Sequence, residues 1–136
     1  RIFGRLGFAQ FHCVLPMLAS LAGLTEILKA TSEAGAGSFL AVLKRFGAQE
    51  SAFSFPMEGY TLALDFPVTP PVLRLLDRLD AITIDHGGRF YLAKDSRMSR
   101  ATCAASAPRV AAFQKTRQEQ TWQESFASAQ SERLAL

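Results

Sequence analysis

The 136-residue sequence lacks the features that define several large classes of protein. Its two cysteines, Cys13 and Cys103, have neither zinc-site nor redox spacing, so we expect packing residues or inert thiols and no metal site. The longest apolar runs are far too short to span a bilayer, so we expect no transmembrane segment. Only 20% of the residues are charged, and both signs are interspersed, which argues against a nucleic-acid surface.

What the sequence does contain is enough apolar material for one domain with a real core, since 49% of its residues are hydrophobic. It begins at Arg1 rather than at methionine, which indicates a processed chain or a fragment of a longer one.

Apolar residues follow two different periods along the first two thirds of the chain. Alternation predicts strands at 8–15, 38–46, 59–66 and 89–93, and helical spacing predicts helices at 17–34 and from Thr69 to Gly87. The resulting order, β-α-β-β-α-β, predicts an α+β, ferredoxin-like fold. Both helices would cover one face of an antiparallel sheet and leave the other face open.

Each predicted helix carries an apolar stripe. In the second helix Thr69 caps the start, and the stripe consists of Val72, Leu75, Leu76, Leu79 and Ile82. In the first helix the stripe consists of Leu18, Leu21, Leu24, Ile27 and Leu28, with Glu26, Lys29 and Glu33 facing outward.

Residues 98–136 differ in character, because they hold few large apolar residues and many Ala, Ser, Gln and Arg. We predict helices near 98–105, 107–120 and 128–135, the whole forming a helical C-terminal tail. Such a segment cannot build its own core, and residues 1–97 show no surplus core for it. We therefore expect it to pack on a domain that is not part of this sequence.

Polar side chains gather on the face of the sheet that the helices leave open. Strand alternation places Gln10 and His12 there together with Thr61, and Lys44 lies near the end of an apolar strand. A buried, unpaired lysine would cost several kcal/mol, so Lys44 either reaches water or meets an anion. The alternative is that these groups, like Lys94, are merely solvated side chains on an exposed surface.

Four stretches carry a family resemblance. FAQFHCVLP, SFLAVLKRFG, GYTLALDFP and GGRFYLAKDSR, in this order, resemble the C-terminal part of FAD-linked oxidases of the vanillyl-alcohol oxidase superfamily. The resemblance implies that residues 1–88 form part of a substrate-binding domain and that residues 89–136 return to an FAD-binding domain. That FAD-binding domain would be formed by an N-terminal part that is absent here.

The resemblance also implies roles for particular residues. Gln10 and His12 match positions that line the pocket over the isoalloxazine ring, where the family often has Gln in place of His12. Lys44 matches a pocket lysine near the substrate. Thr61 matches a substrate-pocket position that is often Asn, and Ala63 one that can be Cys.

Two further residues, Tyr91 and Lys94, match positions beside the flavin and the substrate. A cation such as Lys94 near the flavin would stabilise the negative charge that develops as hydride is transferred. Lys94, His12 or Lys44 could receive the proton of the substrate alcohol. The histidine-tryptophan-glycine-lysine signature of sugar-lactone oxidases is missing, which argues against that branch.

These implications lead to the following expectation. The chain is a C-terminal fragment of an FAD-dependent oxidoreductase that oxidises a CH–OH group of a sugar-like substrate, in the bacterial cytoplasm or cell envelope. It would supply the pocket wall over the flavin, and by itself it would neither hold FAD nor be active. The alternative is a stand-alone ferredoxin-like binding or regulatory module, which could dimerise through the open face of the sheet.

Overall fold

The structure is a computed structural model that describes residue 5 and residues 7–49, 53–107, 109–120 and 125–136. The strands are β1 (Phe8–Pro16), β2 (Ala41–Phe46), β3 (Gly59–Pro67) and β4 (Arg89–Phe90). The helices are α1 (Ser20–Glu33), α2 (Pro70–Asp85), a 3-10 turn η1 (Leu92–Lys94), α3 (Arg100–Ser106), α4 (Val110–Glu119) and α6 (Ala129–Leu134). No helix among the described residues is long and apolar enough to cross a membrane.

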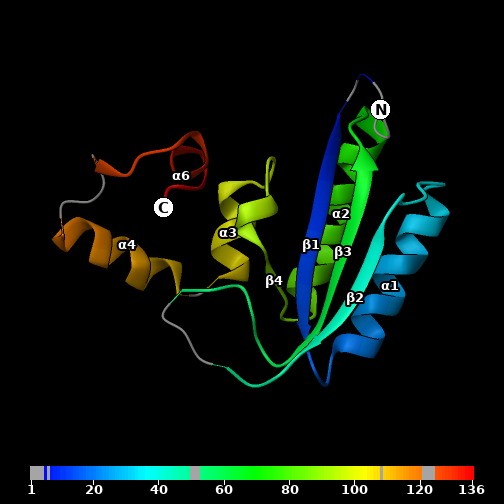
Figure 1. Ribbon diagram of the computed structural model, residues 1–136, viewed down its shortest axis with the longest axis horizontal. Helices are drawn as coiled ribbons and strands as arrows, with labels where there is room; N and C mark the ends of the chain where they lie inside the picture. The colour runs from blue at the N-terminus through cyan, green and yellow to red at the C-terminus, as the bar shows by residue number, and fades with distance from the viewer. Residues whose placement is uncertain (1–4, 6, 50–52, 108, 121–124) are drawn as a thin grey trace.

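The four strands form one antiparallel sheet in the order β2-β3-β1-β4, with α1 and α2 packed on one side of it (Figure 1). This order, together with the β-α-β-β-α-β sequence of elements, confirms the predicted α+β, ferredoxin-like fold. The fourth strand is shorter than expected. Strand pairing with β1 ends at Phe90, the Tyr91 amide makes one more hydrogen bond to His12 of β1, and the chain then turns into η1, which ends at Lys94.

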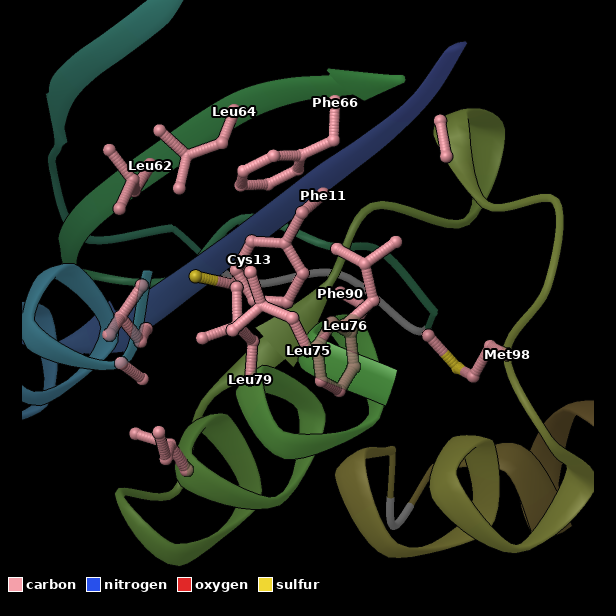
Figure 2. Close-up of a cluster of buried hydrophobic side chains, with 14 of the residues drawn as sticks. Phe11, Cys13, Leu62, Leu64, Phe66, Leu75, Leu76, Leu79, Phe90 and Met98 are labelled. Atoms are coloured by element: carbon pink, nitrogen blue, oxygen red, sulfur yellow. The ribbon is translucent and has the colours of Figure 1, made fainter. Parts of the chain in front are cut away.

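Helix α2 forms where the sequence predicts it. The Thr69 hydroxyl accepts a hydrogen bond from the Val72 amide, and prolines occupy the first turn, where their missing N–H groups cost little. All five residues of its expected stripe are buried. Leu75, Leu76 and Leu79 meet Phe11 and Cys13 of β1 in the main core, which Figure 2 shows. Burial raises the pKa of the Cys13 thiol to about 12, and both cysteines are free and buried, as expected of inert packing residues.

Helix α1 has the predicted period but is rotated relative to the expected stripe. Leu21 and Leu28 are exposed, as is Leu18 just before the helix, whereas Ile27 is buried as expected. The whole buried face consists of Ser20, Gly23, Ile27, Ala30 and Thr31. Small residues fill most of this face because the helix lies close to the sheet. A Cβ atom added at Gly23 would lie only 2.6 Å from Leu15 Cδ1 and 3.0 Å from the His86 ring, so a larger side chain there would have to displace these neighbours.

The C-terminal segment also departs from expectation, because it joins the main core. Met98, Cys103, Val110 and Leu134 are buried in the same apolar cluster as β1 and α2. Figure 1 shows α3, α4 and α6 gathered beyond the β4 edge of the sheet. The prediction that residues 1–97 offer no surface for this segment is therefore wrong. Sparse apolar residues suffice because each one enters the edge of an existing core.

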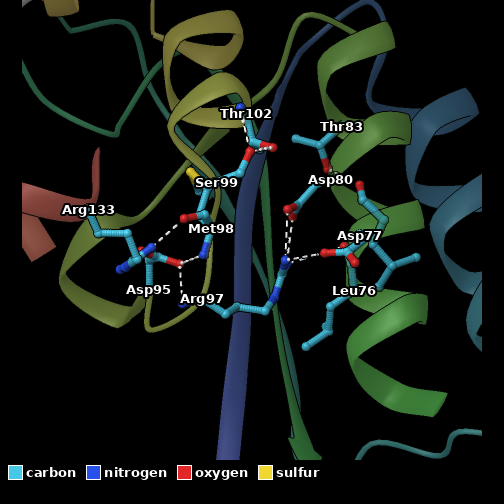
Figure 3. Close-up of polar contacts among 11 residues, drawn as sticks. Leu76, Asp77, Asp80, Thr83, Asp95, Arg97, Met98, Ser99, Thr102 and Arg133 are labelled. Carbon is cyan, nitrogen blue, oxygen red and sulfur yellow. Dashed lines mark hydrogen bonds and ion pairs between the residues drawn. The ribbon is translucent and has the colours of Figure 1, made fainter. Parts of the chain in front are cut away.

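An ion-pair cluster around Arg97 fastens the start of this segment to α2, and a second pair joins Asp95 to Arg133 of α6 (Figure 3). Arg97 donates to both carboxylate oxygens of Asp80, at 2.7 and 2.9 Å, and to Asp77 at 3.1 Å. Asp95 accepts from the Met98 amide at 2.7 Å and from Arg133 at 2.8 Å. Asp95 thus caps the turn before α3, whereas the cap of α3 itself is Ser99.

Candidate functional site

The expected polar residues do lie on one face of the sheet. The register pairs His12 with Ala63, and it pairs Lys44 with Thr61. Residues paired across neighbouring strands share a face, and so do residues two apart along a strand. Gln10, His12, Lys44, Thr61 and Ala63 therefore all lie on the side of the sheet opposite α1 and α2.

The Thr61 hydroxyl determines which ring nitrogen of His12 carries the proton. It donates its single proton to the backbone carbonyl of Cys13 at 2.8 Å, so its oxygen can only accept from His12 Nε2, 3.0 Å away. The neutral ring consequently carries its proton on Nε2 and a lone pair on Nδ1. Within the described part of the chain, buried Nδ1 has no hydrogen-bond partner.

The surroundings of His12 favour this neutral form. Burial lowers the pKa of the ring below its ordinary value of 6.5, and the positive charges of Lys44 and Lys94 lower it further. Phe55 and Tyr91 lie edge-to-face against the imidazole, with ring centroids 5.0 and 5.2 Å away. These rings help to enclose His12.

Gln10 is held by a residue that the sequence reasoning missed. Its amide nitrogen donates to Asp65 Oδ1 at 2.6 Å, and Asp65 is itself only 5% exposed. The register pairs the two residues directly across β1 and β3. Strand alternation does place Asp65 on the same face as Thr61 and Ala63, but it does not show that Asp65 holds Gln10.

Lys94 lies outside the sheet but close to it. It ends η1, is exposed, and lines a recess of about 320 Å³ whose other residues include Gln10, Ala93 and Ser96. Lys44 is also exposed and does not line this recess. Both lysines lie near enough to His12 to affect its pKa.

Tyr91 joins the β4 side of the molecule to this face. Its backbone amide donates to the carbonyl of His12 at 2.9 Å, and its ring contacts both His12 and Phe55. Phe55 is buried although it comes from the irregular segment between β2 and β3. No periodic pattern marks that segment, so Phe55 could not be predicted from the sequence. Groups of three or more metal-ligating side chains are absent from the described residues.

The described residues thus form a polar sheet face with an amide and an amine beside a recess. The chain is 34% identical, over 137 aligned residues that cover all of it, to decaprenylphosphoryl-β-D-ribose oxidase of Mycolicibacterium smegmatis. It is 32% identical over 115 residues, or 83% of its length, to an uncharacterized protein in the mprA 5′ region of Streptomyces coelicolor. No family model matches the chain.

The first of these similarities confirms the resemblance to an oxidase of this kind that the sequence motifs indicated. The chain spans 30% of the length of the Mycolicibacterium protein and 31% of the Streptomyces protein. The division at residue 88, and the roles of Gln10, His12, Lys44, Thr61, Ala63, Tyr91 and Lys94, remain predictions.

Proposed function

We propose that this chain forms the substrate-facing wall of an FAD-dependent oxidoreductase that oxidises a CH–OH group of a sugar-like substrate. The observation that carries the proposal is the joint placement of Gln10, His12, Lys44 and Thr61 on one sheet face, with Lys94 close by. Identity of 34% along the whole chain to an oxidase of a phosphoryl-ribose compound supports the same conclusion.

The residues fit a flavin at this face. A recess bordered by an amide and an amine, Gln10 and Lys94, suits the polar edge of a planar cofactor, and Tyr91 presents an exposed aromatic ring nearby. FAD, when bound, would accept the hydride from the substrate carbon. Most of its binding surface would come from an N-terminal FAD-binding domain, so this chain alone is expected to be inactive.

Among the three candidates for handling the substrate proton, Lys94 is the best placed. It is exposed and lines the open recess, whereas the lone pair of His12 lies on a buried nitrogen. We therefore assign proton transfer to Lys94. His12 acts as a positioning residue, which Thr61 holds in one tautomer. Lys44 contributes positive charge at the other side of the face.

The test uses the product of the complete gene, purified with its flavin, and follows the loss of flavin absorbance after mixing with a phosphoryl-ribose lipid. Lys94→Met should slow flavin reduction by about 10²-fold or more, the usual cost of losing an acid–base group. Lys29→Met, a matched change on the exposed side of α1, should leave the rate unchanged.

Two results would contradict the proposal. One is a gene product that contains no flavin. The other is tight, stoichiometric binding of FAD by this chain alone, measured as flavin absorbance that elutes with the protein, because the cofactor would then not depend on another domain.

A further inference from the structure

Lys94 ends a very short turn that has few hydrogen bonds of its own. Within η1 the Lys94 amide donates to the Tyr91 carbonyl at 3.0 Å, and the Asp95 amide donates to the Leu92 carbonyl at 3.1 Å. A 3-10 turn of this length has poor hydrogen-bond geometry and little stability of its own. The lysine side chain is also long and flexible. The position of its ammonium group therefore depends on what else holds this turn.

The side-chain amide of Gln130, from helix α6, holds the turn on both sides of Lys94. Its Nε2 donates to the Leu92 carbonyl at 2.6 Å, to the Asp95 carbonyl at 3.2 Å and to Asp95 Oδ2 at 3.3 Å. The Leu92 carbonyl thus accepts two hydrogen bonds, one from within the turn and one from α6, as its two lone pairs allow. A single side chain of α6 therefore contacts the chain both before and after the lysine.

Asp95, the residue after Lys94, is held as a charged carboxylate. Its Oδ1 accepts from the backbone amides of Arg97 and Met98 at 3.0 and 2.7 Å, and its Oδ2 accepts from Arg133 of α6 at 2.8 Å. Burial raises the pKa of this carboxyl, but these hydrogen bonds and the one from Gln130 outweigh burial and hold the pKa below its ordinary value of 3.8. Helix α6 is thus joined to this residue by an ion pair as well as by an amide.

Helix α6 can support the turn because it is itself attached to the rest of the molecule. Leu134 is buried in the main apolar cluster, and Ser128 and Ser131 form a capping box at the start of the helix. Arg133 also donates to the Met98 carbonyl. A helix held at these points can fix the position of η1.

The other end of the turn is attached to the polar face, because the Tyr91 amide donates to the His12 carbonyl at 2.9 Å. Lys94 lines the same recess as Gln10. We propose that Gln130 is the positioning residue of Lys94, and that through it α6 holds η1 so that the ammonium group stays at this recess. The consequence for catalysis rests on the proposed function, whereas the placement of the lysine can be measured without flavin.

The test of placement is an NMR titration of the His12 ring in this chain. Burial lowers the pKa of this ring, and the positive charges of Lys44 and Lys94 lower it further. Lys94→Met should therefore raise the pKa of His12. Gln130→Met, which keeps a side chain of similar length but removes its hydrogen bonds, should raise this pKa too. In the double variant the second change should add nothing to Lys94→Met, because both act through the same ammonium group.

Gln114→Met is the matched control. It removes the hydrogen bond from Gln114 to the Ala135 carbonyl, which attaches the same C-terminal segment to α4 without touching η1. This control should leave the pKa of His12 unchanged. The proposal would be overturned if that pKa did not respond to Lys94→Met or to Gln130→Met, or if it responded equally to Gln114→Met. Unchanged methyl resonances of the apolar core show that each variant is folded.

The consequence for catalysis is measured on the complete gene product. Gln130→Met should slow flavin reduction by about ten-fold, because a small displacement of a catalytic group is costly. Gln130→Lys keeps a donor for the Leu92 carbonyl and should recover most of the rate. If Gln130→Met raises the pKa of His12 but leaves flavin reduction unchanged, the catalytic role of Lys94 is wrong and its positioning stands. A slower reaction with no change in that pKa would overturn the positioning.

Discussion

At the scale of single residues, the most informative side chain is His12. The hydrogen bond from its Nε2 to Thr61 fixes the tautomer, and burial with two nearby lysines favours the neutral ring. Strand alternation was enough to place His12, Gln10 and Thr61 on one face. It could not reveal Phe55, because its segment has no periodic pattern and owes its position to contacts with distant residues.

The lowered pKa of His12 makes stability depend on pH in a definite direction. Above pH 6.5 the ring is neutral in both folded and unfolded chains, so it has no effect. As the pH falls below 6.5, the unfolded chain takes up the proton first, and the free energy of unfolding decreases. Because the ring is only half-buried, we expect a loss of about 1 kcal/mol or less between about pH 7.5 and about pH 5.5.

Urea unfolding at the two pH values measures this loss. His12→Gln keeps a hydrogen-bonding side chain but cannot titrate, so its unfolding free energy should fall less over the same range. His86→Gln removes the other histidine and should not abolish the fall. A His12→Gln variant as pH-sensitive as the parent chain would show that the ring is not held neutral.

At the scale of elements, the sequence predicted the type and order of the helices and strands better than their orientation. Helix α2 has one apolar stripe and a clear cap, so its type, start and buried face were all predictable. Helix α1 offers leucines beside a face that holds Ile27 and several small residues, and hydrophobicity alone selects the leucines. The face that is buried is the one with Gly23, which lets the helix approach Leu15 closely.

The attachment of the C-terminal segment to α2 depends on Arg97. Its side chain is 18% exposed, and that of its partner Asp80 is 6% exposed. Removing the cation would leave a buried carboxylate without its ion-pair partner, and burial already disfavours the charged form of that carboxylate. Arg97→Ala should therefore lower the free energy of unfolding by about 3 kcal/mol. Arg78→Ala, which breaks the exposed pair with Glu33, should cost less than about 1 kcal/mol.

Urea denaturation of the two variants measures the difference. Replacing both partners, as Arg97→Met with Asp80→Leu, should restore part of the lost stability, because no unpaired charge then remains. If Arg97→Ala and Arg78→Ala lowered the free energy of unfolding equally, the Arg97–Asp80 ion pair would not anchor the C-terminal segment.

At the scale of the whole molecule, the apolar residues that are buried differ from those that the sequence predicted to be buried. The C-terminal segment, which looked too poor in apolar residues to pack on this chain, contributes four side chains to the core. Leu21 and Leu28 of helix α1 and the preceding Leu18, all members of the predicted apolar stripe, are exposed. Total apolar content predicted that one core exists, but which residues enter it depends on how closely the elements approach.

A matched pair of leucine substitutions tests this distribution. Leu134 of α6 is 2% exposed and Leu21 of α1 is 82% exposed. Leu134→Ala should lower the free energy of unfolding by about 2–4 kcal/mol, since it removes buried atoms and leaves a cavity. Leu21→Ala should change it by less than about 0.5 kcal/mol. Urea denaturation measures both changes in unfolding free energy. A larger loss for Leu21→Ala than for Leu134→Ala would mean that the C-terminal segment packs elsewhere and that the outer face of α1 is the buried one.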